Sequence, residues 1–366
     1  MLKELIFARK SPSTVNRRLT GVALDPILKY LEPTAKSLDG ATIAISGASG
    51  FIGTWIVESL IQISQEFDIQ FDLHLLTREI KNLETRAYDL SSNIRIKLCQ
   101  VDLSLEIPNL PECSHVIHAA SPTQGLLKDE DNPFRINTRG LSNFIEGANN
   151  KNKKVRVLNC SSGAVYGRRY LRDESIKSDE LMNEDSRSRD FFNEYSLAKI
   201  QSERIVSDLT SQNRISGINM RLFAFYGPLL PLTGKYAIGN FLKSCAEKSR
   251  IYVQSSGESI RSYQHASHLC AQIIYLLTQQ IEGEIDIGSL DSKSIAWWAN
   301  YVGELFNVEV NIANELPEIP TVYVPRNVNS LPRIVETEES REIFFREWFT
   351  WIQKFEPLAS SKNFRV

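Results

Sequence analysis

The residues best suited to chemistry lie in "NCSSGAVYG", residues 159–167, and in "EYSLAK", residues 194–199. Tyr195 and Lys199 are four positions apart, so on a helix they share one face. A neighbouring ammonium group lowers the pKa of a phenol because it favours the phenolate. Such a tyrosine can exchange a proton with a hydroxyl or a carbonyl group, and a serine hydroxyl at a strand end can hydrogen-bond the same oxygen. The pattern predicts an acid–base site built from Ser162, Tyr195 and Lys199.

A glycine-rich segment, "GASGFIG", lies between a short apolar strand and a helical repeat of apolar residues. Gly47 suits the tight turn, Gly50 leaves room for a pyrophosphate, and Gly53 allows the helix to pack close to the sheet. The N-terminus of the following helix offers backbone N–H groups and a positive dipole to phosphates. In this context the loop predicts a dinucleotide-binding turn.

The next strand ends in "TREI", where dinucleotide sites select their cofactor. An acidic residue at this point holds the ribose 2′-hydroxyl, whereas an arginine accepts a 2′-phosphate. Thr77 and Arg78 offer one arginine and no acid at the tip, although Glu79 follows directly. The sequence therefore predicts NAD(P) as cofactor and favours NADP(H) over NAD.

These segments belong to an alternating pattern of strands and helices, which predicts right-handed crossovers and a parallel sheet covered on both faces. Beyond residue 228 the regularity falls, and prolines and short elements follow. We expect an α/β protein with a Rossmann-type doubly wound parallel sheet and a smaller mixed α/β C-terminal region. The predicted division is a helical extension at 1–40, the NAD(P)-binding domain at 41–228 and a substrate-binding region at 229–366. Predicted strands are 41–47, 72–78, 94–103, 115–121, 154–162 and 217–227, with helices at 15–38, 50–63, 131–150 and 193–209.

Taken together, the motifs resemble the extended short-chain dehydrogenases/reductases, in the nucleotide-sugar epimerase/dehydratase group. "GASGFIG" is similar to the cofactor loop of this family, "SSGAVYG" to its serine strand and "YSLAK" to its YxxxK signature. The resemblance covers roughly residues 41–280. It extends to "VDL" at 101–103, "HAAS" at 118–121, "RLFAFYGP" at 221–228 and "GESIRSYQHASHL" at 257–269.

The resemblance implies roles for individual residues. Ser162, Tyr195 and Lys199 would be catalytic, and Ser162 and Arg261 would bind substrate, with Arg261 gripping a nucleotide-sugar diphosphate. Residues implied to bind the cofactor are Gly47, Ser49, Gly50, Phe51, Ile52, Gly53, Thr77, Arg78, Asp102, Leu103, Ala119, Ala120, Ser121, Tyr195 and Lys199.

Departures from the family pattern narrow the chemistry that the resemblance implies. Sugar 4,6-dehydratases carry Asp-Glu after the serine, decarboxylating relatives a glutamate at the second position, and some epimerase-reductases a cysteine there. Here the two positions are Gly163 and Ala164, which do no acid–base work. Ala224 also replaces a sugar-contacting asparagine of many relatives. We therefore expect hydride transfer at sugar C4, by a 4-keto reductase or a 4-epimerase, in surface polysaccharide or deoxysugar biosynthesis.

Three alternatives stay open. The first is a nucleotide-sugar dehydratase of the same family, and the second is a reductase of a small carbonyl compound that lacks a nucleotide. The third is a cofactor-binding regulator, against which the intact set of Ser162, Tyr195 and Lys199 argues. As in many relatives, a homodimer through the helices at 131–150 and 193–209 is implied.

Composition sets the remaining bounds. The 366 residues are 42% hydrophobic and 23% charged, with a net charge of −2, which gives no global attraction for nucleic acid. No apolar run reaches the roughly 18–20 residues of a membrane span.

The five cysteines show no CxxC pair, so reduced thiols and a cytoplasmic location are expected. His265 and His268 are three apart without a third ligand nearby, so no metal site is predicted. The polar stretch at 168–193 would be a loop over the substrate cleft or a solvated loop.

Overall fold

We describe a computed structural model of the chain. It describes residues 19, 28, 30–84, 95–121, 132–148, 154–167, 192–232, 234, 236–313, 319–326, 328, 331 and 334–355. Most of the predicted helix before residue 28 and the predicted loop at 168–193, up to residue 191, lie outside this set.

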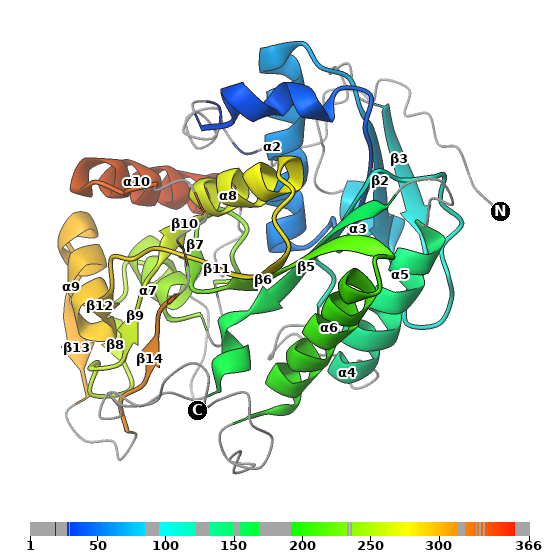
Figure 1. The fold of residues 1–366 in the computed structure, drawn as a ribbon. Helices are drawn as coiled ribbons and strands as arrows, with labels where there is room; N and C mark the ends of the chain where they lie inside the picture. Colours follow the sequence, from blue (N-terminus) through cyan, green and yellow to red (C-terminus); the bar gives the residue numbers. More distant parts are fainter. Residues whose placement is uncertain are drawn as a thin grey trace.

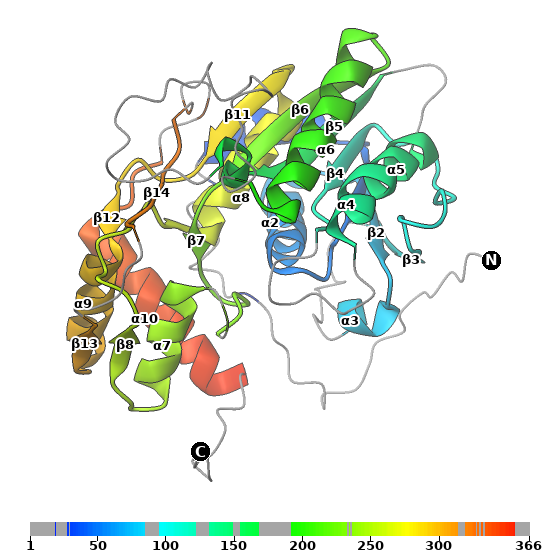
Figure 2. The same ribbon diagram turned by 90° about the horizontal axis from the view of Figure 1, so that it is seen from below.

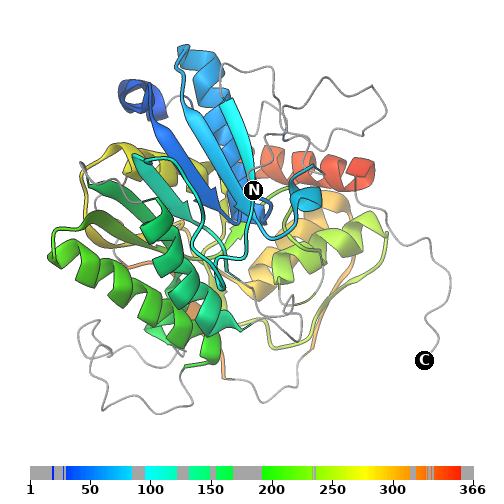
Figure 3. The same cartoon turned by 90° about the vertical axis from the view of Figure 1, so that its right-hand side faces the viewer.

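A seven-stranded sheet forms the centre of the protein, and every neighbouring pair of its strands is parallel (Figures 1 and 3). Its order is β11-β6-β5-β4-β1-β2-β3, so the chain winds outward from β1 in both directions. All eight residues of β5 are buried, as expected for a central strand covered on both faces. The strands are β1 Thr42–Ser46, β2 Asp72–Thr77, β3 Arg95–Gln100, β4 His115–His118, β5 Val155–Ser162, β6 Ile215–Leu222 and β11 Gly283–Ile287.

Helices cover both faces of this sheet, which confirms the predicted doubly wound α/β class. Helices α2 (Phe51–Phe67) and α8 (Ala266–Thr278) lie on one face (Figure 1). On the other lie α5 (Leu141–Gly147) and α6 (Glu194–Ser211). The predicted 131–150 helix is divided into α4 (Pro133–Arg135), a π-helical turn at Ile136–Gly140, and α5. Shorter elements are η1 Lys36–Leu38, α3 Ile80–Glu84 and η3 Gly163–Tyr166.

The elements of the C-terminal region lie beside the sheet (Figure 2), and they enclose a second hydrophobic core. Aromatic side chains fill it: Tyr226 stacks on Phe345 with ring centroids 4.6 Å apart, and Trp298 and Trp348 are fully buried. The region contains α7 Ala237–Ala246, α9 Ile295–Phe306 and α10 Glu338–Phe355. Its short strands are β7 Phe225–Tyr226, β8 Ile251–Val253, β9 Ile260–Arg261, β10 Gln264–His265, β12 Lys293–Ser294, β13 Val310–Ile312 and β14 Val322–Tyr323.

The division of the chain at residue 228 stays a prediction. Strand β11 and helix α8 lie beyond that residue in the sequence, yet they join the central sheet and its covering layer. None of the helices among the described residues has the length and apolar character needed to cross a membrane.

Candidate active site

The predicted cofactor residues gather at one edge of the sheet. Because β1 to β5 are parallel, their carboxyl ends meet at the same side. Gly47 follows β1, Thr77 ends β2, Asp102 follows β3, Ala119 follows β4 and Ser162 ends β5. These residues are separated by more than a hundred positions in the sequence, yet they lie along the same edge of the sheet.

The glycine loop has the close packing that a dinucleotide site needs. Gly47 has φ +69°, and a Cβ there would lie 2.7 Å from the backbone of Ala119. A Cβ on Gly53 would lie 2.2 Å from the carbonyl oxygen of Gly47. Gly50 is the N-cap of α2 and provides no side-chain cap, so nothing on that residue stands between the helix N-terminus and an anion. These residues fit the pyrophosphate of a nicotinamide dinucleotide.

The residues predicted around the adenosine end lie together as well. The hydroxyls of Ser49 and Thr77 are 3.5 Å apart, and Arg78 is exposed directly after β2. The Asp102 carboxylate accepts hydrogen bonds from the backbone N–H and the hydroxyl of Ser104, at 2.9 and 2.6 Å. Asp102 is therefore oriented by its own turn before any ligand binds.

Helix α6 carries Tyr195 in its first turn because a capping box fixes where the helix begins. The Asn193 side chain accepts from the backbone N–H of Ser196, and the Ser196 hydroxyl accepts from the backbone N–H of Asn193. One turn later, Lys199 is buried, and its Nζ donates to the carbonyl oxygen of Cys160 at 2.7 Å. The Lys199 ammonium lies 5.8 Å from the centre of the Tyr195 ring.

The electrostatics differ from the expectation that Lys199 would lower the pKa of Tyr195. Burial raises the pKa of Tyr195 well above its usual value, and the neighbouring Tyr323 adds to the rise. The hydroxyls of Ser162 and Ser121 oppose the rise. Burial also lowers the pKa of Lys199 to about 8. The spacing of four brings the two groups near each other, but desolvation is the largest cause of both pKa shifts. The phenol is therefore protonated at neutral pH.

A buried network of polar side chains contacts Ser161 at the end of β5. The sequence did not lead us to predict it. The Ser161 hydroxyl donates to Glu203 at 2.5 Å, and Arg221 forms an ion pair with the same carboxylate at 2.7 Å. Arg221 also donates to the Tyr166 hydroxyl, which donates to Asp286, both at 2.9 Å. Glu203 lies four positions after Lys199, so the same helical spacing was a signal for it.

The space beside Gly163, the position after the predicted catalytic serine, is filled by a residue that directly follows β6. A Cβ on Gly163 would lie 2.5 Å from the ring of Phe223. Phe223 is buried against Tyr323 and Tyr166, with ring centroids 4.9 and 6.3 Å apart, so its ring has little room to move. Glycine is therefore required at position 163 by packing.

Arg261, the predicted diphosphate residue, lies on β9 in the C-terminal region. Its guanidinium donates to the carbonyl oxygens of Ile260 and Thr321 at 2.8 and 3.1 Å, and to the Thr321 hydroxyl at 3.0 Å. Burial lowers its pKa. In this structure the Arg261 side chain is thus bound to β9 and to the segment that leads into β14.

The histidines singled out by the sequence make local contacts. His118 is buried at the end of β4, its Nδ1 lies 2.8 Å from the Ser46 hydroxyl, and burial lowers its pKa to about 3. His265 Nδ1 lies 2.7 Å from the Ser267 hydroxyl, and His268 faces the Glu336 carboxylate at 3.2 Å. The His118 contact joins β4 to β1, and those of His265 and His268 lie at the start of α8.

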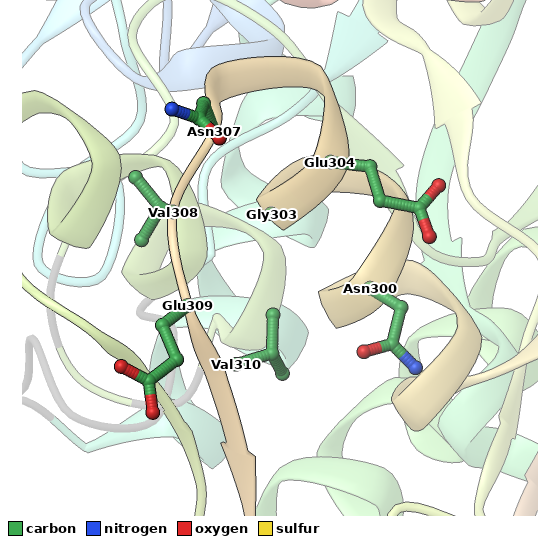
Figure 4. A pocket seen from close by; sticks show the side chains of 7 residues that line it. All are labelled: Asn300, Gly303, Glu304, Asn307, Val308, Glu309 and Val310. Carbon is green, nitrogen blue, oxygen red and sulfur yellow. The ribbon is translucent and has the colours of Figure 1, made fainter.

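A surface hollow lies elsewhere, between α9 and β13 (Figure 4). Its lining combines the acidic side chains of Glu304 and Glu309 with Asn300 and Val310. None of the predicted catalytic or cofactor-binding residues borders it.

Comparison with known proteins finds similar sequences and a similar fold. The model of the NAD dependent epimerase/dehydratase family matches residues 43–288. UDP-glucuronic acid decarboxylase 3 from Arabidopsis thaliana is 25% identical over 80% of this chain and 81% of its own length. Cinnamoyl-CoA reductase 1 from Petunia hybrida is 24% identical over 60% of this chain and 65% of its own. UDP-N-acetylglucosamine 4-epimerase from Methanobrevibacter ruminantium M1 has a similar fold, with a TM-score of 0.66 and 19% identity, over 86% of this chain and 98% of that structure.

Proposed function

Because this chain belongs to the NAD-dependent epimerase/dehydratase family and is an enzyme of that family, we propose that it transfers hydride at C4 of a nucleotide-activated sugar. The reaction would be that of a 4-keto reductase or a 4-epimerase. A bound nicotinamide supplies or accepts the hydride. Tyr195 gives a proton to the C4 oxygen or takes one from it, and Ser162 hydrogen-bonds that oxygen. Lys199, one helical turn after Tyr195, holds this part of α6 in place.

The packing around Gly163 is the observation that carries this proposal. Dehydration needs an acid after the catalytic serine to lose the C6 hydroxyl, and the Phe223 ring occupies the space that a side chain there would need. Ala164, the next residue, has no ionisable group. Proton exchange at the C4 oxygen through Tyr195 needs neither position. The site therefore favours redox at C4 over elimination or decarboxylation.

The raised pKa of Tyr195 keeps its phenol in the proton-donating form, which suits the reduction step that a 4-keto reductase and a 4-epimerase share. A protonated phenol is a proton donor, which is what a ketone oxygen needs when it receives hydride. The oxidation step of a 4-epimerase begins instead from a proton acceptor.

Product analysis tests the proposed function. We expect the purified protein, supplied with NAD(P)(H) and a panel of UDP- and dTDP-hexoses and their 4-keto forms, to yield C4-reduced or C4-inverted sugars by ¹H NMR. A 4-keto-6-deoxy sugar or a pentose product would contradict it. Mass identification of nucleotide released by denaturation separates the two reactions: tightly held NAD favours the epimerase, whereas an empty site that NADPH fills favours the reductase.

The alternative of a small carbonyl substrate without a nucleotide is supported by the similarity to dihydroflavonol 4-reductase from Gerbera hybrida, which is 26% identical over 64% of this chain and 64% of its own length. Arg261→Ala should raise KM for a nucleotide sugar, because the arginine would no longer reach the diphosphate. An unchanged KM would defeat the nucleotide-sugar assignment and leave the small-carbonyl reductase.

Cofactor preference gives a separate prediction. Arg78→Ala should raise the Kd for NADPH by about tenfold or more and leave the Kd for NADH within about twofold, because one charge-assisted contact to the 2′-phosphate is lost. Fluorescence titration with both cofactors measures this. Arg250→Ala, which removes a surface arginine paired with Glu309, is the matched control. Equal weakening of both cofactors would show that Arg78 does not select NADPH.

We also propose a homodimer and a cytoplasmic location. Two large apolar side chains are exposed on the helices expected to pair, Phe134 on α4 at 43% and Leu197 on α6 at 45%. Gel filtration at micromolar concentration tests the pairing. All five cysteines are free thiols, which suits a reducing compartment.

A further inference from the structure

A second tyrosine hydroxyl reaches the predicted catalytic serine, and it comes from the other end of the chain. Tyr323, on β14, places its hydroxyl 3.1 Å from Ser162 Oγ and 3.2 Å from the carbonyl oxygen of Leu222. Its ring packs against Phe223, with centroids 4.9 Å apart. Packing on Phe223 and the backbone acceptor on β6 therefore fix the position of the hydroxyl.

The hydrogen-bond donors around Ser162 show what its contact with Tyr323 controls. The backbone N–H of Ala164 already donates to Ser162 Oγ at 3.2 Å, so the serine hydroxyl has one proton to direct. When Tyr323 donates to Leu222, Ser162 donates to Tyr323. When Tyr323 donates to Ser162, the serine proton is released toward another acceptor, such as the Tyr195 hydroxyl, which Ser162 also contacts, or a sugar oxygen. The Tyr323 hydroxyl thus decides where the serine proton points.

Tyr323 is also tied to the predicted substrate-binding arginine. Strand β14 pairs with β9 in a register that sets Tyr323 opposite Arg261. Arg261 reinforces the pairing by donating to Thr321 at the start of the same segment. A ligand that draws Arg261 toward its phosphates acts on the strand pair that carries the Tyr323 hydroxyl.

Resting on the proposed function, we propose that Tyr323 is a positioning residue for Ser162. Its hydroxyl sets the direction of the serine proton and links that proton to the strand pair that carries Arg261. Tyr323 acts through Ser162 and does not itself transfer the proton to substrate.

A double-mutant cycle tests the proposal. Tyr323→Phe keeps the ring against Phe223 and removes only the hydroxyl, so we expect kcat to fall about tenfold with KM within about twofold, the loss of roughly one oriented hydrogen bond. In a Ser162→Ala background the same change should cost less than about twofold, because the two residues act as a unit. Wild-type kcat in Tyr323→Phe, or an equal loss in both backgrounds, would overturn the proposal.

The control variant is Tyr226→Phe, which removes another buried tyrosine hydroxyl, one that donates to Glu336 at 3.0 Å in the second core. It should keep wild-type kcat even if its Tm falls. A loss of kcat matching that of Tyr323→Phe would show that both variants act through stability alone.

An NMR measurement that needs no substrate tests the contact between Tyr323 and Ser162 independently of the proposed function. With ¹³Cζ-labelled tyrosine, the Tyr323 resonance is the one missing from Tyr323→Phe, and it should shift in Ser162→Ala but not in Tyr226→Phe. An unmoved resonance would disprove the contact. Should the wild type be inactive on every nucleotide sugar, the proposed function fails, and the kinetic cycle is run on a small carbonyl compound that the enzyme reduces.

Discussion

Replacing Tyr195 with phenylalanine should lower kcat by about 10²- to 10⁴-fold, the usual contribution of a general acid–base group. The ring stays in place in the first turn of α6, so packing and the capping box at Asn193 are preserved. Only the hydroxyl group that we propose to move a proton to or from the substrate oxygen is lost. Cofactor affinity should stay within about threefold, because one hydroxyl contact among many is removed.

Steady-state kinetics and a cofactor titration on the same preparation measure the two quantities. Tyr252→Phe is the control, since that side chain is 62% exposed on β8. An unchanged kcat in Tyr195→Phe would refute the catalytic assignment, and a protein that no longer binds cofactor would indicate a structural role instead.

The direction of the Tyr195 pKa shift adds a pH test to the same prediction. The raised pKa means that the phenol, the proton-donating form, predominates across neutral pH and is lost only when pH rises through that elevated value. As far as Tyr195 sets the rate, carbonyl reduction should be flat across neutral pH and fall in alkali. A reduction rate that rose steeply with pH near neutrality would mean that the tyrosine acts from its ionised form.

The strands, the glycine loop and the Tyr195–Lys199 pair could be predicted because their signals are local. Alternating apolar runs fix the strands, and a spacing of four fixes the shared helix face. The parallel order of the strands then requires Gly47, Thr77 and Ser162 to meet at one edge. Each of these steps needs only neighbouring residues and a general rule of topology.

The surroundings of Ser162 could not be predicted because they depend on contacts made far along the chain. Tyr323 lies 161 positions from the serine that it contacts. It reaches Ser162 through the pairing of β14 with β9, two strands of two residues each that leave almost no periodic signal. The pKa of Tyr195 also escaped prediction, because its rise comes mainly from burial, and burial is a property of the whole fold.

Gly163→Ala should lower the free energy of unfolding by about 1–3 kcal/mol, the usual cost of an extra methyl group in a filled core. The added Cβ would lie 2.5 Å from the Phe223 ring. That ring is 3% exposed and is confined by Tyr323 on one side and Tyr166 on the other. Denaturant unfolding of both proteins measures the difference.

Gly140→Ala is the matched control, because a Cβ there would meet its nearest neighbour, Leu103, at an ordinary 3.6 Å. Its backbone is already helical, with φ −60°, so the change should be neutral or slightly stabilising. A loss equal to that of Gly163→Ala would assign the effect to glycine replacement in general.

Removing the Phe223 ring tests whether that ring causes the loss of stability expected in Gly163→Ala. Phe223→Ala alone should cost about 3–5 kcal/mol, as expected for a large cavity, but Gly163→Ala added to it should cost close to nothing, because the space is then open. If the two losses simply added, Phe223 would not be what excludes a side chain at position 163. If they couple as expected, the same ring also bars an aspartate from that position. Gly163→Asp with Ala164→Glu should then fail to produce a dehydrated sugar unless Phe223 is replaced as well, which ties the expected reaction to a packing contact between the residues that directly follow β6 and β5.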